Sequence, residues 1–317
     1  MFDNITVEQF NENFMSLIDD PAMFKKAQVA ASQYVRMKLR EEGVMRRYFN
    51  DLMERVTVED PRYQIDPENA DTGYLLIDKE PDTYALRMTY RAQPRAEYIM
   101  GQKFIVPFAK YESPVFEKQE MELRNIRMPI TDVIRSNLVY DLQEAEDKYF
   151  LKVLETAIEV TENQVVSDEG ELSKRALKNL LNKIESDRLR VDAFIMSQTT
   201  INDALTWEHS DIGDEVREVV INGVKWPTLF GRRLVTTTNS DVLPKGVVYA
   251  LTAPNFLGTA ATLGDPTFWL KKEKDMLQMA AWYYAGFNIG NIKGAARLIL
   301  TGDSSEGEGE TQGETSD

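Results

Sequence analysis

The side chains best suited to catalysis are few in this sequence of 317 residues. It contains one histidine, His209, and no cysteine, so a thiol nucleophile and a thiolate metal site are excluded. A Ser-His-Asp triad would need His209 beside an activated serine, and no G-x-S-x-G segment is present. We therefore interpret His209 as a surface loop residue rather than a general base or a metal ligand.

Carboxylates are the remaining candidates for chemistry. Glu144, Glu146 and Asp147 cluster in one predicted helix, where a solvated polar face is the favoured interpretation. A hydrolase pair or a Mg²⁺ site is the alternative. No G-x-x-x-x-G-K-[ST] loop and no G-x-G-x-x-G is found. We expect no catalytic residue, no metal and no cofactor.

Three glycines recur every four residues, at Gly286, Gly290 and Gly294. In a strand-rich context this spacing predicts a turn between two strands rather than a ligand-binding loop. The overall formal charge of −15 argues against tight binding of nucleic acid, because an acidic surface repels phosphates. No apolar window reaches the roughly 20 residues of a membrane helix, and the first residues do not resemble a signal peptide.

The elements that would position any site begin with a long helix at Thr131–Glu159. An α-helix of this length spans roughly 40 Å, so it would act as the spine of a domain. Its apolar residues recur at steps of three or four, which places them on one stripe. The predicted stripe consists of Ile134, Leu138, Leu142, Ala145, Tyr149, Val153 and Ala157.

The residues before this spine divide into two parts. The first 55 or so read as helices, with Gly43 as a stop, and they either dock on their own domain or reach onto a neighbouring copy. Residues 56–129 are rich in proline, which excludes long helices. The runs Tyr84–Arg91 and Lys103–Phe108 alternate as strands of a hairpin. Such a hairpin cannot bury itself and must lie on another surface.

The residues after the spine read as helices on a mixed or antiparallel sheet, an α+β arrangement. A short helix capped by Ser173 precedes a buried strand at Val191–Ser197. Further strands follow, including Val216–Ile221, Met276–Phe287 and Ala295–Leu300. The last residues, 302–317, are acidic and of low complexity, and are expected to be disordered.

Three segments make the sequence resemble the major capsid proteins of tailed bacteriophages. They are FEKQEMELRNIRM leading into PITDVIRSNLVYDLQEAEDKYF, then VDAFIMSQTTINDAL, and GVKWPTLFGRRLVTTTNSDVLPKGVVYAL. The resemblance implies an α+β capsid fold. Its segments would be an N-terminal helical arm (1–55), an extended hairpin loop or E-loop (56–128), the spine helix of a peripheral (P) domain (129–164), an axial (A) domain (165–264), closing strands of the P domain (265–301) and the acidic tail (302–317).

By analogy, the chain would be a major capsid protein that self-assembles into the icosahedral shell around the double-stranded DNA of a tailed phage. Its partners would be further copies in pentamers and hexamers, and packaged DNA bound without sequence specificity; no membrane is implied. Scaffolding, portal and decoration proteins remain open as partners, and assembly would occur in a bacterial cytoplasm. The candidate contacts between subunits are Arg87, Arg91, Arg95, Phe104 and Phe108.

Three alternatives remain. One is an encapsulin-like bacterial compartment, which shares the capsid fold but houses a cargo enzyme. Another, from a different class, is a hydrolase that uses carboxylates with or without a metal ion. The third is a tail-tube or adaptor subunit of a phage, which would form tubes rather than closed particles.

Overall fold

The computed structural model describes Phe14, Ile18 and residues 23–49, 52–65, 73–79, 102–125, 129–207 and 228–302. The predictions for His209, for the strands Tyr84–Arg91 and Val216–Ile221 and for the tail from residue 303 onward lie outside these residues. The chain divides into two units. Unit 1 comprises Met1–Val160 and Thr252–Gly294, and unit 2 comprises Thr161–Leu251 and Ala295–Asp317.

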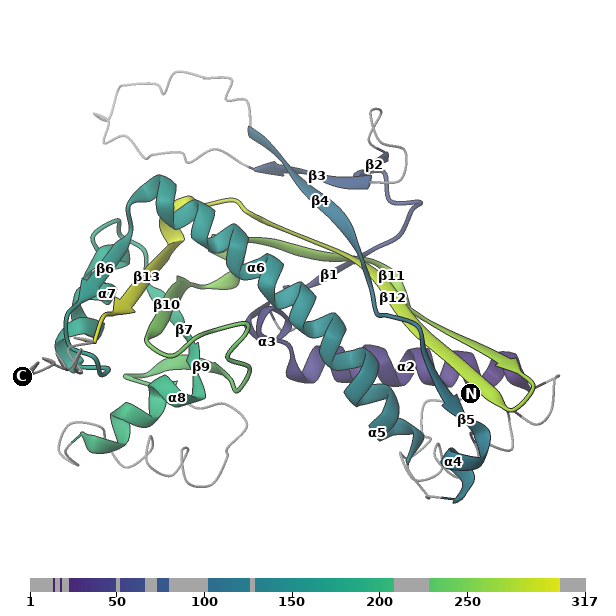
Figure 1. The fold of residues 1–317 in the computed structure, drawn as a ribbon. Helices are drawn as coiled ribbons and strands as arrows, with labels where there is room; N and C mark the ends of the chain where they lie inside the picture. The colour runs from purple at the N-terminus through teal and green to yellow at the C-terminus, as the bar shows by residue number, and fades with distance from the viewer. Residues whose placement is uncertain are drawn as a thin grey trace, which may run out of the picture. The chain divides into compact units, whose positions relative to one another are not determined.

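Unit 1 is built on a seven-stranded sheet in which two long antiparallel strands form the centre (Figure 1). Its strand order is β1-β11-β12-β4-β3-β2, and β5 also pairs with β12. The strands are β1 (Glu54–Val56), β2 (Tyr63–Ile65), β3 (Gly73–Lys79), β4 (Gln102–Glu112), β5 (Phe116–Gln119), β11 (Gly258–Glu273) and β12 (Met276–Ile289). Two short helical turns, α10 (Pro254–Leu257) and η4 (Ile292–Gly294), flank the β11–β12 pair in sequence.

The predicted spine is confirmed as one continuous helical rod. It consists of α5 (Ile130–Ile134), a π-helical turn η2 (Arg135–Val139) and α6 (Tyr140–Thr161). The sequence pattern gave no sign of the π-helical turn. Three further helices of unit 1 are α2 (Phe24–Glu42), α3 (Val44–Phe49) and α4 (Glu120–Asn125).

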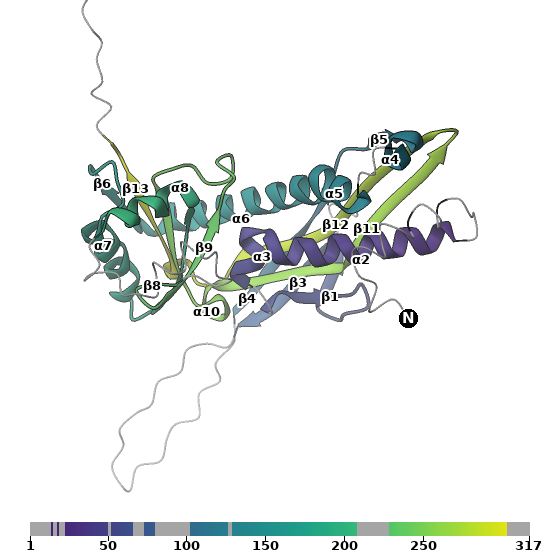
Figure 2. The ribbon, with the colours of Figure 1, turned by 90° about the horizontal axis from the view of Figure 1, so that it is seen from below.

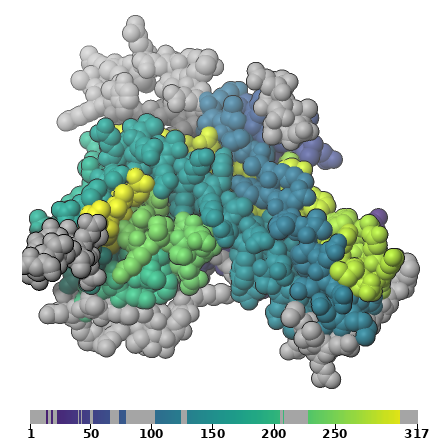
Figure 3. Space-filling model, in the orientation of Figure 1, coloured from purple at the N-terminus to yellow at the C-terminus, as the bar shows by residue number. Residues whose placement is uncertain are grey.

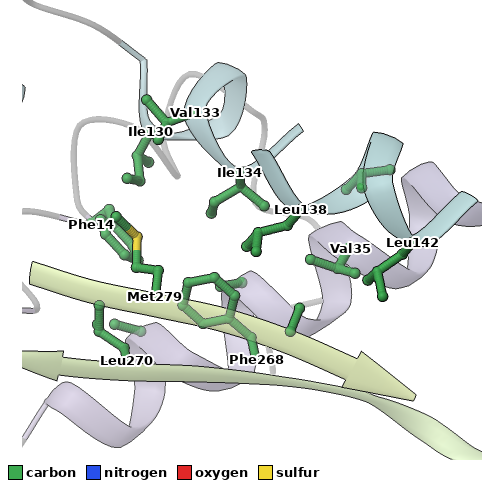
Figure 4. Close-up of a cluster of buried hydrophobic side chains, with 14 of the residues drawn as sticks. Phe14, Val35, Ile130, Val133, Ile134, Leu138, Leu142, Phe268, Leu270 and Met279 are labelled. Atoms are coloured by element: carbon green, nitrogen blue, oxygen red, sulfur yellow. The ribbon is translucent and has the colours of Figure 1, made fainter. Parts of the chain in front are cut away.

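The spine, α2 and the sheet enclose the main core of unit 1 (Figure 4). Ile134 and Leu138 of the spine, Val35 of α2 and Phe268 of β11 are all buried in it. Figure 2 shows α2 running alongside β11. Of the two placements open for the N-terminal helices, the structure therefore shows residues 24–49 docked within their own unit.

The predicted apolar stripe of the spine is correct at its start and only partly correct further along. The predicted positions that are buried are Ile134, Leu138, Leu142 and Ala157. Between Leu142 and Ala157 the prediction fails. Ala145 is exposed, and Tyr149 and Val153 are only partly buried. The residues that follow these two, Phe150 and Leu154, are buried instead. The shift begins after Leu142, where Glu146 and Asp147 are buried instead of Ala145, so the buried positions that follow fall one residue later than predicted.

Unit 2 contains a six-stranded sheet with the order β6-β13-β10-β7-β9-β8. The strands are β6 (Gln164–Ser167), β7 (Val191–Ser197), β8 (Thr228–Leu229), β9 (Arg232–Thr237), β10 (Val247–Thr252) and β13 (Ala295–Leu300). The helices are α7 (Lys174–Glu185), α8 (Gln198–Ile201) and η3 (Asn202–Thr206). The predicted Ser173 cap is confirmed, since its hydroxyl accepts a hydrogen bond from the Ala176 N–H.

The two units differ from the segments expected by resemblance. The expected closing segment 265–301 is divided, because β13 pairs with β10 and β6 in unit 2 while β11 and β12 belong to unit 1. Residues 258–264, expected in the axial domain, are part of β11 in unit 1. Sheet pairing between distant strands decides both boundaries, and the names P and A domain stay predictions.

Candidate functional site

The strand β4 changes its partner halfway along its length. Phe108–Glu112 pair with β12, whereas Gln102–Pro107 pair with β3. Because β2 covers β3 only as far as Leu75, the residues beyond it form a two-stranded ribbon. Within the described part of the chain, this ribbon joins Leu76–Lys79 to Gln102–Ile105 and has no third strand.

This ribbon is the described part of the predicted hairpin. The predicted strand Lys103–Phe108 is confirmed as part of β4. Its partner among the described residues is β3, and the other predicted strand, Tyr84–Arg91, lies outside them. An isolated two-stranded ribbon is at best marginally stable in water, so this one needs a further surface to lie on.

The ribbon presents apolar and charged side chains to its surroundings. Ile105 is 47% exposed, although an isoleucine on a strand is usually covered. Asp78 and Lys103 face each other across the two strands at 3.6 Å, and both are largely exposed. On the edge of β4 away from β3, the Asn288 side-chain N–H donates a hydrogen bond of 2.6 Å to the Ile105 carbonyl.

Of the five predicted contacts between subunits, the structure describes two. Phe104 is half-buried and packs at the margin of a small cluster that contains Val106 and Leu75. Phe108 is only 4% exposed and lies inside the same cluster, with its ring 6.0 Å from that of Tyr63. Little of Phe108 is therefore left for a neighbouring molecule. The contact roles of Phe104, of Phe108 and of the three arginines stay predictions, and the three arginines lie outside the described residues.

The carboxylates of the spine do not form the solvated face expected from the sequence. Glu146 is 1% exposed and accepts two hydrogen bonds from Arg46, from Nε at 2.7 Å and from Nη2 at 3.2 Å. The Arg46 guanidinium also lies 4.8 Å from the centre of the Tyr283 ring, which stacks on Tyr111. Burial, together with the nearby Glu146 carboxylate, raises the pKa of Tyr283, so this phenol stays neutral.

Asp147 is also buried and connects the spine to the N-terminal helices. Its two carboxylate oxygens accept hydrogen bonds from the backbone N–H groups of Val44 and Met45, at 2.9 and 2.8 Å. These are the first residues of α3, so the carboxylate caps that helix. Burial raises the pKa of Asp147 to about 7, although the two backbone hydrogen bonds lower it. Glu144 alone of the three keeps to the outer face, paired with Lys148 at 2.5 Å.

These hydrogen bonds account for the burial of two of the three clustered carboxylates, and this structural role requires no catalysis. Glu146 and Asp147 hold α3 to the spine, and both are too deeply buried to meet a substrate. In the part of the chain that the structure describes, no group of three or more His, Cys, Asp or Glu side chains could hold a metal ion. The outer face of the spine is open to the surroundings (Figure 3).

The predicted turn at the spaced glycines is confirmed in part. Gly290 and Gly294 lie between β12 and β13, whereas Gly286 lies inside β12. There a Cβ atom would come within 2.4 Å of the Pro107 carbonyl oxygen on β4. This glycine is therefore required by the close approach of the two strands. Among the described residues, no helix is long and apolar enough to cross a membrane.

The chain is similar in structure to proteins of several phages. It matches Mycobacterium phage Bobi with a TM-score of 0.52 at 9% identity, over 82% of this chain and 91% of that one. It matches Mycobacterium phage Adephagia with a TM-score of 0.52 at 10% identity, over 81% and 90%. The match to Microbacterium phage Oxtober96 has a TM-score of 0.50 at 12% identity, over 78% and 91%.

No protein-family model matches the sequence, and no curated protein matches it. The likeness is thus one of structure at low sequence identity. It extends over most of this chain and nearly the whole length of its neighbours. The fold is that of the capsid proteins of tailed phages, an α+β fold with a spine helix and long central strands, as the sequence resemblance implied.

Proposed function

We propose that the chain is a major capsid protein, which self-assembles into the icosahedral shell enclosing the double-stranded DNA of a tailed phage. The observation that carries this proposal is the phage capsid fold. The three structural matches cover 78–82% of this chain. A fold alone does not fix a function. The rest of the argument comes from features of this chain that a single copy leaves without a surface to pack against.

The β3–β4 ribbon is the clearest of these features. Among the described residues, the ribbon exposes Ile105, its two strands pair with each other, and further hydrogen bonds come from the Leu76 N–H to the Arg62 carbonyl and from the Asn288 side chain to the Ile105 carbonyl. A neighbouring subunit that covers the ribbon would bury this apolar surface. In a closed shell each subunit both gives and receives such a contact, so many weak contacts add up to a stable particle.

The proposal includes the absence of an enzymatic role. The hydrolase alternative relied on Glu144, Glu146 and Asp147, and two of these side chains are buried in structural hydrogen bonds. If the alternative were correct, an activity would be lost on replacing the exposed Glu144 by alanine while the fold was retained. We expect no such activity.

The charge of the chain fits a container for DNA better than a DNA-binding protein. With 52 acidic and 37 basic residues, an assembled shell would be strongly negative at neutral pH. Such a surface repels the phosphate backbone, which would let packaged DNA slide instead of adhering to the wall.

Electron microscopy of the purified chain tests the proposal. We expect closed particles, with or without added scaffolding protein, for the wild-type chain. Ile105→Asp should abolish or strongly reduce particle formation while the circular dichroism spectrum is retained. Met121→Asp is the control, because Met121 is also exposed, at 58%, but lies on α4 away from the ribbon. A chain that stays a compact monomer at every concentration, salt and scaffold condition would refute the proposal.

An encapsulin-like compartment is distinguished from a capsid protein by the genes beside its own and by the contents of its particles. Genes for a terminase and a portal beside its own gene, and particles from the native source that contain double-stranded DNA, are expected for a capsid protein. A neighbouring gene for a cargo enzyme, with that enzyme inside the particles, would identify a compartment instead.

A further inference from the structure

The helix α7 of unit 2 carries four basic residues and one acidic residue. Its outer face exposes Arg175, Lys178 and Lys183, while Ala176, Leu177, Leu180 and Ile184 are buried against the sheet. The first turn of α7 contains no acidic residue. Among the described residues, Arg175, Lys178 and Lys183 form no ion pair, whereas Glu185 at the far end is paired with Arg232 at 2.5 Å.

The acidic C-terminal segment begins directly beside this helix. The last strand, β13, pairs in parallel with β6, and the Thr301 N–H donates a hydrogen bond to the Ser167 carbonyl at 2.9 Å. Gly302 follows and lies against Gly170, where a Cβ atom would be 3.0 Å from the Gly302 Cα. Only three residues separate Gly170 from the start of α7 at Lys174.

The next residues, 303–317, lie outside the described residues, but their sequence is clear. They contain no lysine or arginine, and their acidic residues are Asp303, Glu306, Glu308, Glu310, Glu314 and Asp317. An extended chain of this length reaches up to roughly 50 Å. The helix α7 is only about 18 Å long, so the segment is long enough to follow it from end to end.

A shallow depression continues the basic face at the far end of α7. Its volume is about 360 Å³, and it is lined by Gln164, Val165, Asn179, Asn182, Lys183 and Ser186. These amide and hydroxyl groups can donate hydrogen bonds to carboxylates or to peptide carbonyl groups. Lys183 lines the depression, so the depression adjoins the basic residues of α7, and the exposed acids Asp168, Glu169 and Glu171 flank the exit point beside Gly170.

We propose that residues 303–317 bind in cis along the outer face of α7 and neutralise Arg175, Lys178 and Lys183. The occupant is assigned by opposite charge, by the exit point beside Gly170 and by the length of the segment. Contacts of this kind are weakened by salt, because exposed charges are screened. The segment would compete with any other anionic partner for α7. This inference does not depend on the proposed capsid function.

Zero-length carbodiimide cross-linking of the full chain, analysed by mass spectrometry, tests the proposal. The reagent joins a carboxylate to a lysine amine that touches it. We expect cross-links from residues 303–317 to Lys178 and Lys183 to exceed those to Lys245, and those to Lys25 and Lys26, by about five-fold at low ionic strength and to fall toward the control level at about 1 M salt. Lys245 is an exposed lysine of the same unit outside α7, and Lys25 and Lys26 are exposed on α2.

Two matched variants sharpen the test. Arg175→Gln with Lys178→Gln should lower the cross-linking of Lys183 several-fold, whereas Lys25→Gln with Lys26→Gln should leave it unchanged. All four side chains are exposed, so neither variant disturbs a core. Mixing isotopically heavy and light chains should give cross-links within one chain only. Equal cross-linking of control and α7 lysines, no response to salt, or predominantly heavy–light cross-links would each overturn the proposal.

Discussion

The guanidinium of Arg46 and the carboxylate of Glu146 form a two-point ion pair that is almost completely enclosed in unit 1. Arg46 is 6% exposed and Glu146 is 1% exposed, and the two residues are 100 positions apart in the sequence. Together with the capping of α3 by Asp147, this pair attaches the N-terminal helices to the spine. It gives the first of four predictions.

Breaking the pair from one side should be costly, because it leaves a buried charge without a partner. We expect Arg46→Met to lower the free energy of unfolding by roughly 3–5 kcal/mol. The double variant Arg46→Met with Glu146→Leu should recover most of this loss, since no unpaired charge remains. Chemical denaturation of the unassembled subunit measures both.

The exposed pair of Glu144 and Lys148 serves as the control for this experiment. Replacing Lys148 by glutamine should change the free energy of unfolding by less than about 0.5 kcal/mol, as for other exposed helix pairs. A double variant no more stable than Arg46→Met alone would contradict the interpretation of the buried pair.

Asp147 should make stability depend on pH. Its pKa is about 7 in the folded chain, against about 3.9 in an unfolded one, so between these values the folded state binds more protons. The free energy of unfolding should therefore fall as pH rises from about 4 to about 7, and this contribution should be constant above that range.

The variant Asp147→Asn isolates this effect, because an asparagine side chain does not titrate. The free energy of unfolding of the wild-type chain minus that of the variant should decrease as pH rises from about 5 to about 7.5. Glu146 and Arg47, which also act on Asp147, are present in both chains and cancel to first order. If the free energies of unfolding of the two chains change with pH in parallel over this range, the prediction is ruled out.

Gly286 should not tolerate even alanine. The added Cβ would lie 2.4 Å from the Pro107 oxygen and 3.1 Å from its carbonyl carbon, both of them backbone atoms that cannot rotate away. We expect Gly286→Ala to reduce stability by about 1–3 kcal/mol or more, through separation of β4 from β12.

Gly290→Ala is the matched control, since a Cβ there makes only ordinary contacts of 3.8 Å and longer. Thermal unfolding of the two variants gives the comparison. A loss of stability at Gly290 as large as that at Gly286 would show that close strand approach is not the cause.

Asn288 should hold the outer half of β4 in place. Removing its hydrogen bond to the Ile105 carbonyl, by Asn288→Ala, should cost about 1 kcal/mol and speed amide hydrogen exchange in Gln102–Val106. Exchange in Phe108–Glu112, which pair with β12, should change little.

Asn291→Ala is the appropriate comparison, because its side-chain oxygen accepts a local hydrogen bond from the Lys293 N–H. Faster exchange along the whole of β4 in the Asn288 variant, or none at all, would count against the local role assigned to Asn288.

Much of the fold could be predicted from the sequence, because the relevant signals are local. The helical period of its apolar residues located the spine, and the structure extends it only slightly, to Ile130–Thr161. Ser173 marked the start of α7, and alternation marked Lys103–Phe108 as a strand. The scarcity of catalytic side chains, and the resemblance of three segments to phage capsid proteins, indicated a structural protein.

The candidate site could be predicted less well. The sequence pointed to an unsupported hairpin, and the described residues contain such a ribbon; the partner of β4 there is β3, while Tyr84–Arg91 lie outside the described residues. Phe108, an expected contact between subunits, is only 4% exposed in the single chain, and its contact role stays a prediction. Alternation identifies a strand, but it does not identify which strand lies beside it or which face is already covered.

By itself, therefore, the sequence determined the kinds and positions of the main elements and the absence of cysteine chemistry. Only the tertiary structure decided that Glu146 and Asp147 point inward and that β13 joins the sheet of unit 2. The physical reason is the same in both cases. Helical and strand periods are set by residues a few positions apart, whereas a buried charge or a strand pairing depends on a partner far along the chain. Arg46, 100 residues before Glu146, is such a partner.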